Sequence, residues 1–141
     1  MTTETATKVT VEPLGALKGA VVRGLDATRL TAEQKEFLRQ QWYKHGILIL
    51  KNQTLDEEQQ KAFAEIFGPI SDEGEYGAQM YVGNVKAGSL TPHGELAFHC
   101  DHSWSHDPLR GIMLYAIEVP PPGAGGETLF ADVGKAYDLL P

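Results

Sequence analysis

The segment RGIMLYAIEV, residues 110–119, has a centre, IMLYAI, that is apolar on both faces of an extended chain. A short apolar run without polar alternation predicts a strand buried on both sides, and therefore a central strand of a sheet. The runs QMYVGNV, ELAFHCDHSW and GETLFAD are separated by segments rich in Gly, Asn or Pro and also predict strands. The second half of the chain is therefore expected to be rich in β-structure.

The first half begins its helical pattern at residue 31, with TAEQKEFLRQQWYKHG. Thr31 and Gln34 have capping-box spacing, and Gly46 is a typical stop. The next residues, ILIL at 47–50, form a short apolar run that predicts a buried strand. The apolar face of the predicted helix contains Phe37, Leu38 and Trp42.

A second helix is predicted from TLDEEQQKAFAEIFG, which starts at Thr54. Thr54 and Glu57 have the spacing of a cap and its box, and Gly68-Pro69 ends the pattern. Two helices followed by a β-rich half predict an α+β fold. The apolar face of this second helix contains Phe63, Ile66 and Phe67.

Composition limits the class of protein. The chain has 141 residues, of which 42% are hydrophobic and 22% charged, as in a globular domain with a sizeable core. Its net charge of −7 and its scattered Lys and Arg residues argue against a nucleic-acid or anionic-membrane partner. No apolar run approaches the roughly 20 residues that a membrane helix needs.

The single cysteine bears on the cellular compartment, and the C-terminal residues bear on whether the domain is complete. Cys100 has no second cysteine to pair with, which excludes an internal disulfide and suits the reducing cytoplasm. The final residues, GKAYDLLP, indicate the opening turns of a helix or a connection. Because domains do not usually end inside an apolar segment, we expect the chain to be part of something longer.

The segment FHCDHSW, residues 98–104, concentrates side chains that bind metals. If it is a strand, His99 and Asp101 point to one face, and Cys100 and His102 to the other. An imidazole beside a carboxylate suits a divalent first-row metal, and one more histidine would complete the two-His-one-carboxylate face of non-haem Fe(II) sites. For the His-x-Asp pair alone, a hydrogen-bonded strand end without a metal is the alternative.

The other side chains of this segment have simpler interpretations. The alternation places Cys100 away from the candidate ligands, which predicts a buried, inert thiol. His102 and His106 could add ligands for a zinc site. Their i, i+4 spacing is that of a helix, whereas Pro108 indicates a loop.

In order along the chain, HCDHSW and GGETLFAD resemble motifs of the taurine dioxygenase/2,4-D dioxygenase (TauD/TfdA) family, which depends on Fe(II) and 2-oxoglutarate. WYKHGILIL and FAEIFGPI are similar to the family's helix-then-strand and to its following helix end, so the resemblance covers most of the chain. The resemblance implies an α+β chain that is the N-terminal part of a double-stranded β-helix (jelly-roll), with helices packed on one sheet.

The same resemblance implies site residues. His99 and Asp101 correspond to the first two Fe(II) ligands, and Thr128 to the threonine that hydrogen-bonds a carboxylate of the co-substrate 2-oxoglutarate. A threonine in an otherwise apolar strand also needs a polar partner on physical grounds. The implied activity is the hydroxylation of a small organic, acidic substrate with O2.

The substrate pocket is expected to involve the stretch before the ligand strand. Tyr81, Asn84 and Glu95 are the candidates there, although Glu95 would repel the sulfonate or carboxylate group of an acidic substrate. Trp104 is either a wall of the pocket or part of the core. Without the family's usual asparagine-containing approach to the ligand strand, taurine itself is disfavoured as the substrate.

The family's third iron ligand, a distal histidine, and its co-substrate arginine come after the threonine motif. We therefore expect residues 1–141 to be a C-terminally incomplete TauD/TfdA-like domain, cytoplasmic, with a small-molecule substrate and with homo-oligomerisation left open. Two other classes remain: a non-catalytic binding or regulatory module, and a zinc hydrolase site built from His99, Asp101, His102 and His106.

Overall fold

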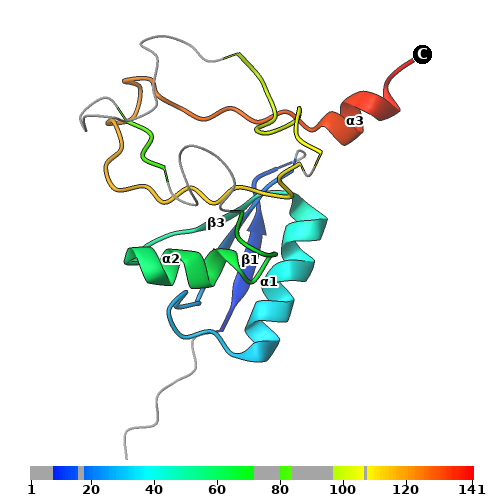
Figure 1. Cartoon of the computed structure of the whole chain (residues 1–141). Helices are drawn as coiled ribbons and strands as arrows, with labels where there is room; N and C mark the ends of the chain where they lie inside the picture. The colour runs from blue at the N-terminus through cyan, green and yellow to red at the C-terminus, as the bar shows by residue number, and fades with distance from the viewer. Residues whose placement is uncertain (1–7, 16–17, 72–79, 84–96, 107) are drawn as a thin grey trace, which may run out of the picture. The chain divides into compact units, whose positions relative to one another are not determined.

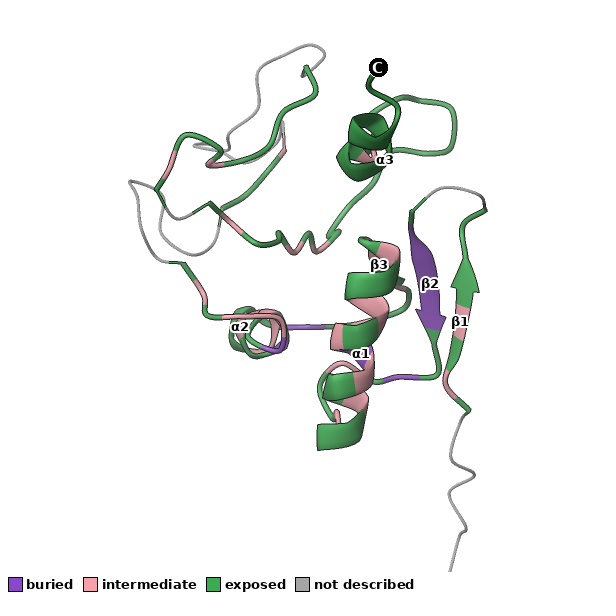
Figure 2. Cartoon of the chain, turned by 90° about the vertical axis from the view of Figure 1, so that its right-hand side faces the viewer, coloured by how far each residue is buried: buried purple, intermediate pink, exposed green. Residues whose placement is uncertain are grey.

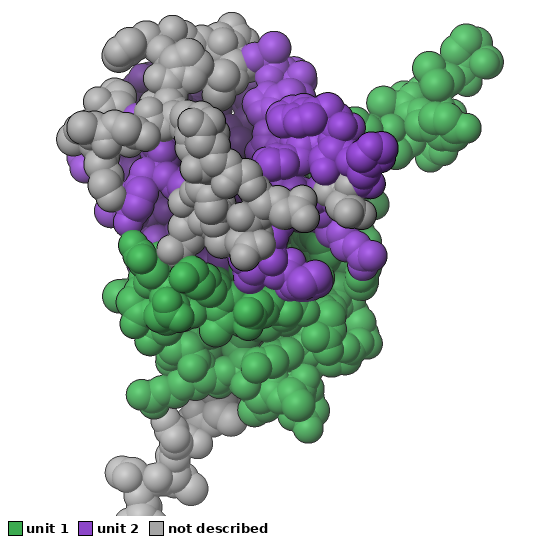
Figure 3. Space-filling view, in the orientation of Figure 1, with its two compact units in different colours: residues 1–67, 132–141 green, residues 68–131 purple. Residues whose placement is uncertain are grey.

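The computed structural model describes residues 8–15, 18–71, 80–83, 97–106 and 108–141. Its elements are, in order, β1 (Thr10–Pro13), β2 (Ala20–Arg23), α1 (Ala32–His45), β3 (Leu48–Leu50), α2 (Glu57–Ala64) and α3 (Val133–Asp138) (Figure 1). The chain divides into two compact units, Met1–Phe67 with Asp132–Pro141, and Gly68–Ala131 (Figure 3). The helices and strands of the described residues all belong to the first unit.

The first unit is built on a small mixed sheet in the order β1-β2-β3. Strand β2 pairs antiparallel with β1, with Val22 opposite Val11, and parallel with β3, with Val21 opposite Ile49. Because β2 lies between the other two strands, its residues Ala20–Val22 are buried (Figure 2). The chain is therefore α+β in the described part, with α1 packed on β3.

The prediction of the first helix is confirmed. The N–H of Gln34 donates to Oγ1 of Thr31 at 3.2 Å, and the N–H of Thr31 donates to Oε1 of Gln34 at 2.9 Å. Gly46, with a φ of 72°, ends the helix and donates its N–H to the carbonyl of Trp42. Leu38, on the predicted apolar face, is fully buried.

The apolar run after this helix forms the predicted strand, β3, but the prediction that it is buried was wrong. Ile49 is 36% exposed and its two neighbours in the strand are half-buried. The reason is that β3 is an edge strand of the three-stranded sheet, so the apolar run does not have neighbours on both sides.

The second helix exists, although its predicted cap was wrong. Asp56, not Thr54, is the N-cap: its Oδ1 accepts the N–H of Gln59 at 2.8 Å, and the N–H of Asp56 donates to Oε1 of Gln59 at 2.9 Å. Aspartate caps a helix as well as threonine does, so the sequence contained two overlapping candidates. Phe63 and Ile66 are buried, as the predicted apolar face requires.

Replacing Asp56 by alanine is expected to lower the free energy of unfolding by about 1 kcal/mol, because the first turn of α2 loses its side-chain acceptor. Urea unfolding followed by circular dichroism measures this change. Thr54→Ala is the matched control and should change stability by less than about 0.5 kcal/mol. A larger loss for Thr54→Ala than for Asp56→Ala would contradict the observed cap.

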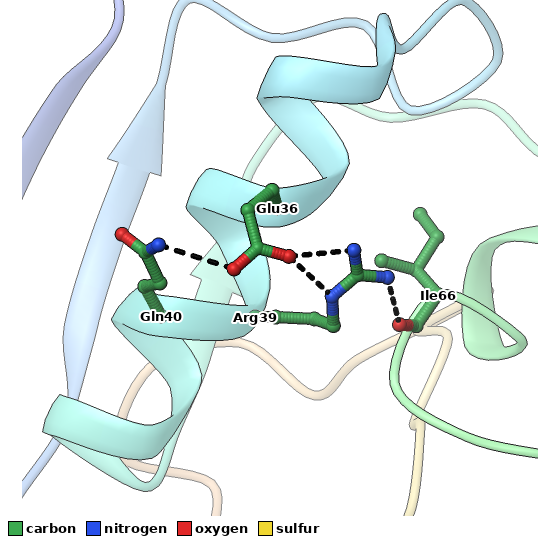
Figure 4. Close-up of polar contacts among 4 residues, drawn as sticks. All are labelled: Glu36, Arg39, Gln40 and Ile66. Atoms are coloured by element: carbon green, nitrogen blue, oxygen red, sulfur yellow. Dashed lines mark hydrogen bonds and ion pairs between the residues drawn. The ribbon is translucent and has the colours of Figure 1, made fainter.

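A polar cluster connects α1 to the residues that follow α2 (Figure 4). Arg39 donates from Nη1 to the carbonyl of Ile66 at 3.1 Å, and from Nη2 and Nε to Oε2 of Glu36 at 2.6 and 2.9 Å. Gln40 donates to the other oxygen of Glu36. The hydrogen bonds from Arg39 and Gln40 lower the pKa of Glu36. The hydrogen bond from Arg39 thus gives a partner to the carbonyl of Ile66, which lies just after α2.

The second unit differs from the sequence-based expectation. Its described residues contain no strand, so the strands predicted from RGIMLYAIEV and GETLFAD are not formed, and none is formed in the described parts of QMYVGNV, residues 80–83, and ELAFHCDHSW, residues 97–104. Ile112, Leu114 and Ile117, predicted to lie in a central strand, are 58%, 64% and 75% exposed. An apolar run becomes a strand only when an adjacent strand supplies hydrogen-bond partners for its backbone N–H and C=O groups. A local sequence pattern does not show whether such a strand is present.

The predicted helical turns near residue 133 are present as α3, where Oδ1 of Asp132 accepts the N–H of Lys135 at 3.1 Å. In the described ranges, no helix has the length and apolar content needed to cross a bilayer.

Candidate metal centre

The centre of the candidate site is the pair formed by His99 and Asp101. Nε2 of His99 lies 2.9 Å from Oδ1 of Asp101, so the two predicted ligands share one face. On its other side, Nδ1 of His99 lies 2.7 Å from the carbonyl oxygen of Ala97. A carbonyl and a carboxylate can only accept, so Nδ1 donates to Ala97 and the contact at Nε2 is an ion pair with the protonated imidazole, the pairing expected without a metal.

The same spacing would also suit a metal ion that replaces the proton on Nε2 and lies between the two side chains. Two adjacent ligands about 2.1 Å from one octahedral ion are separated by about 3 Å, which is close to the observed spacing. A backbone carbonyl that fixes the second ring nitrogen is the usual support of a metal-binding histidine. Both side chains are solvent-accessible, at 57% for His99 and 42% for Asp101, so an ion can reach them.

The protonation of His99 follows from the same contacts. The hydrogen bond to the Ala97 carbonyl, and then the nearby Asp101 carboxylate, raise the pKa of the His99 imidazole. A proton and a metal ion compete for Nε2. Metal binding at the pair should therefore weaken as the pH falls through this raised pKa.

The backbone around the pair is not the predicted strand. The residues from Asp101 onward form a turn, in which His102 has a φ of 54° and its carbonyl accepts the N–H of Ser105 at 3.0 Å. The strict alternation of faces therefore does not apply. Cys100 is exposed, and the prediction of a buried thiol was wrong for this reason.

The structure does not assemble the four-residue zinc site. Within residues 97–106 and the other described ranges, no group of three or more His, Cys, Asp or Glu side chains is placed to hold a metal. His102 turns to stack on Trp104 instead, with ring centroids 5.4 Å apart and planes inclined by 17°. His106 is exposed.

For the other predicted site residues, the structure gives the exposure of three side chains and does not describe the remaining two. Thr128 is exposed in a segment without regular secondary structure, and Tyr81 is 41% exposed. Trp104 is 81% exposed, so in this chain it is not part of a core. Asn84 and Glu95 lie outside the described residues.

Sequence reasoning missed the contact between His102 and Trp104. It assigned His102 to the far face of a strand, whereas a left-handed residue after Asp101 turns the chain. The signal that could have indicated this turn is the polar run DHSWSHDP, which lacks the apolar alternation of a strand and ends in a proline.

Known proteins are similar to most of the chain. The family model described as "Taurine catabolism dioxygenase TauD, TfdA family" matches residues 10–141. An (S)-phenoxypropionate/alpha-ketoglutarate-dioxygenase of Delftia acidovorans is 33% identical over 95% of this chain and 50% of that protein. An alpha-ketoglutarate-dependent 2,4-dichlorophenoxyacetate dioxygenase of Cupriavidus pinatubonensis is 30% identical over 94% of this chain and 53% of that protein.

The chain thus spans about half the length of the curated relatives it matches. Among solved structures, the crystal structure of AAD-2 in complex with Mn(II) and N-oxalylglycine is 29% identical, with a TM-score of 0.41 over 43% of this chain and 24% of that chain.

Proposed function

The chain belongs to the TauD, TfdA family of taurine catabolism dioxygenases, and we propose that it contributes the first part of the active site of an Fe(II)- and 2-oxoglutarate-dependent dioxygenase. In the complete domain of such a protein, the proposed fold is the double-stranded β-helix. The proposed substrate is a small organic acid of the aryloxy type, since the relatives from Delftia and Cupriavidus are named for phenoxypropionate and 2,4-dichlorophenoxyacetate.

The observation that carries this proposal is the pair of His99 and Asp101, 2.9 Å apart and braced by the carbonyl of Ala97. These two side chains would hold the iron, with a further protein ligand needed to complete a facial triad. Bound Fe(II) and 2-oxoglutarate supply the activation of O2 that no amino-acid side chain provides. The role of His99 and Asp101 is to fix the position of the ion and to leave the remaining positions open.

The other residues are assigned by their chemistry. Thr128 would donate its hydroxyl proton to one carboxylate of 2-oxoglutarate. Tyr81, Asn84 and Trp104 would contact the substrate, and Glu95, a negative charge, would face a part of the substrate other than its acid group. A cation for the second carboxylate of 2-oxoglutarate is needed in addition to these residues.

The test is the formation of succinate from 2-oxoglutarate by the complete gene product that carries these 141 residues. We expect succinate to form only with Fe(II) and O2 present, and to increase when phenoxyacetate is added. Zn(II) in place of Fe(II) should give none. Hydrolysis with Zn(II) and without 2-oxoglutarate, or succinate formation that does not depend on iron, would contradict the proposal.

A further inference from the structure

The chain turns directly after Asp101 and presents an aromatic pair. His102 lies in the left-handed region with a φ of 54°, and its ring stacks on the indole of Trp104. A left-handed backbone is uncommon for residues other than glycine, and such conformations are concentrated at functional sites. In this turn, the result of the unusual conformation is that two rings lie nearly parallel.

The outer surface of this pair is open. Trp104 is 81% exposed, while His102 is half-buried and covers part of the indole. An exposed tryptophan is informative because it leaves a large apolar surface in contact with water. This surface follows Asp101 by only three residues, so it belongs to the same short segment as the candidate ligands.

Together these features indicate a binding role for the pair. An aromatic ring stacks on another in an offset arrangement with parallel planes, which is how His102 already contacts Trp104. A third ring can extend that stack from the exposed side. His102 then acts as a support that fixes the plane of the indole before a ligand arrives, which reduces the entropy lost on binding.

We propose that His102 and Trp104 form an aromatic subsite that selects substrates carrying an aryl ring, with the ring of the substrate stacked on the exposed indole surface of Trp104. The proposal rests on the proposed function, because the reacting end of the substrate would lie at the ion held by His99 and Asp101. Trp104 is a specificity-determining residue in this account, and His102 is a positioning residue.

Binding is tested with two ligands matched in shape, phenoxyacetate and cyclohexyloxyacetate. The complete gene product is labelled with 5-fluorotryptophan, and the 19F resonance missing from Trp104→Phe identifies Trp104. Phenoxyacetate is expected to shift this resonance through its ring current, and cyclohexyloxyacetate to leave it nearly unchanged. Equal responses to the two ligands, or no response to either, would overturn the subsite.

Kinetics provide the second measurement. Trp104→Leu keeps an apolar side chain but removes the ring, and is expected to raise the KM for phenoxyacetate about threefold to tenfold. The kcat for phenoxyacetate should change much less, because the ring contact is made equally in the ground state and in the transition state. The KM for cyclohexyloxyacetate should also change much less, because this ligand has no aryl ring to stack on Trp104. Trp104→Phe should restore the preference for the aryl substrate, which a general packing defect would not allow.

His102 is tested separately from its backbone conformation. Asparagine tolerates the left-handed region, so His102→Asn removes the ring while retaining the turn. We expect this variant to reduce the preference for phenoxyacetate and to keep succinate formation dependent on iron.

The two proposals fail in different ways. If succinate forms with Fe(II) and 2-oxoglutarate but Trp104→Leu affects both ligands equally, the subsite is wrong and the proposed function stands. If no iron-dependent succinate forms, the proposed function fails, and the 19F response still decides whether the aromatic pair binds an aryl acid.

Discussion

Replacing His99 by alanine is expected to weaken the binding of a divalent metal by more than about 100-fold, since loss of a mere supporting residue already costs 10–100-fold at such sites. Nε2 of His99 is one of the two proposed ligand atoms, which lie 2.9 Å apart. Asp101→Asn should have a similar effect, because an amide is a neutral and weaker ligand than a carboxylate. Titration with Mn(II), with free Mn(II) followed by electron paramagnetic resonance, measures the affinity.

The matched control for His99→Ala is His106→Ala. His106 is an exposed histidine in the same segment, after Asp101, and within the described residues it does not join the pair to form a group of three ligands. Its removal should leave the affinity for Mn(II) unchanged. Equal losses in the two variants would show that the ion binds the histidine-rich segment without a defined site.

The largest expected effect on stability comes from Leu38→Ala. Leu38 lies in the middle of α1 and is the largest fully buried side chain among the described residues. Truncating a buried leucine removes its transfer free energy and leaves a cavity, so the free energy of unfolding should fall by about 2–5 kcal/mol. Urea unfolding followed by circular dichroism at a helical wavelength measures this change.

Leu140→Ala makes the same chemical change at a position that is 66% exposed and is the control. It should alter stability by less than about 0.5 kcal/mol. A loss for Leu38→Ala as small as that for Leu140→Ala would contradict the packing of α1 in the core of the first unit.

The sequence predicted the first unit well because its signals are local. The capping box of Thr31 with Gln34 and the stop at Gly46 define a helix without reference to the rest of the chain. Where the prediction failed, at the cap of α2, two acceptors lay within three residues and only the backbone conformation distinguishes Asp56 from Thr54.

The second unit was predicted poorly because strands depend on partners distant in sequence. The run around Leu114 was assigned to a central strand, yet Ile112, Leu114 and Ile117 are exposed and the run forms no ladder in the described residues. His99 and Asp101 do lie 2.9 Å apart, although the strand from which this was predicted is not formed, and their role as metal ligands stays a prediction. The contact of His102 with Trp104 follows a left-handed residue, and the polar run DHSWSHDP indicated a turn there but not which residue would adopt that conformation.

The most direct test of the central claim is the visible spectrum of the complete gene product after anaerobic addition of Fe(II) and 2-oxoglutarate. We expect the charge-transfer band of a 2-keto acid chelated to iron, present in His106→Ala and absent in His99→Ala. A spectrum without this band, or a band that persists unchanged in His99→Ala, would contradict the claim that His99 and Asp101 hold the iron.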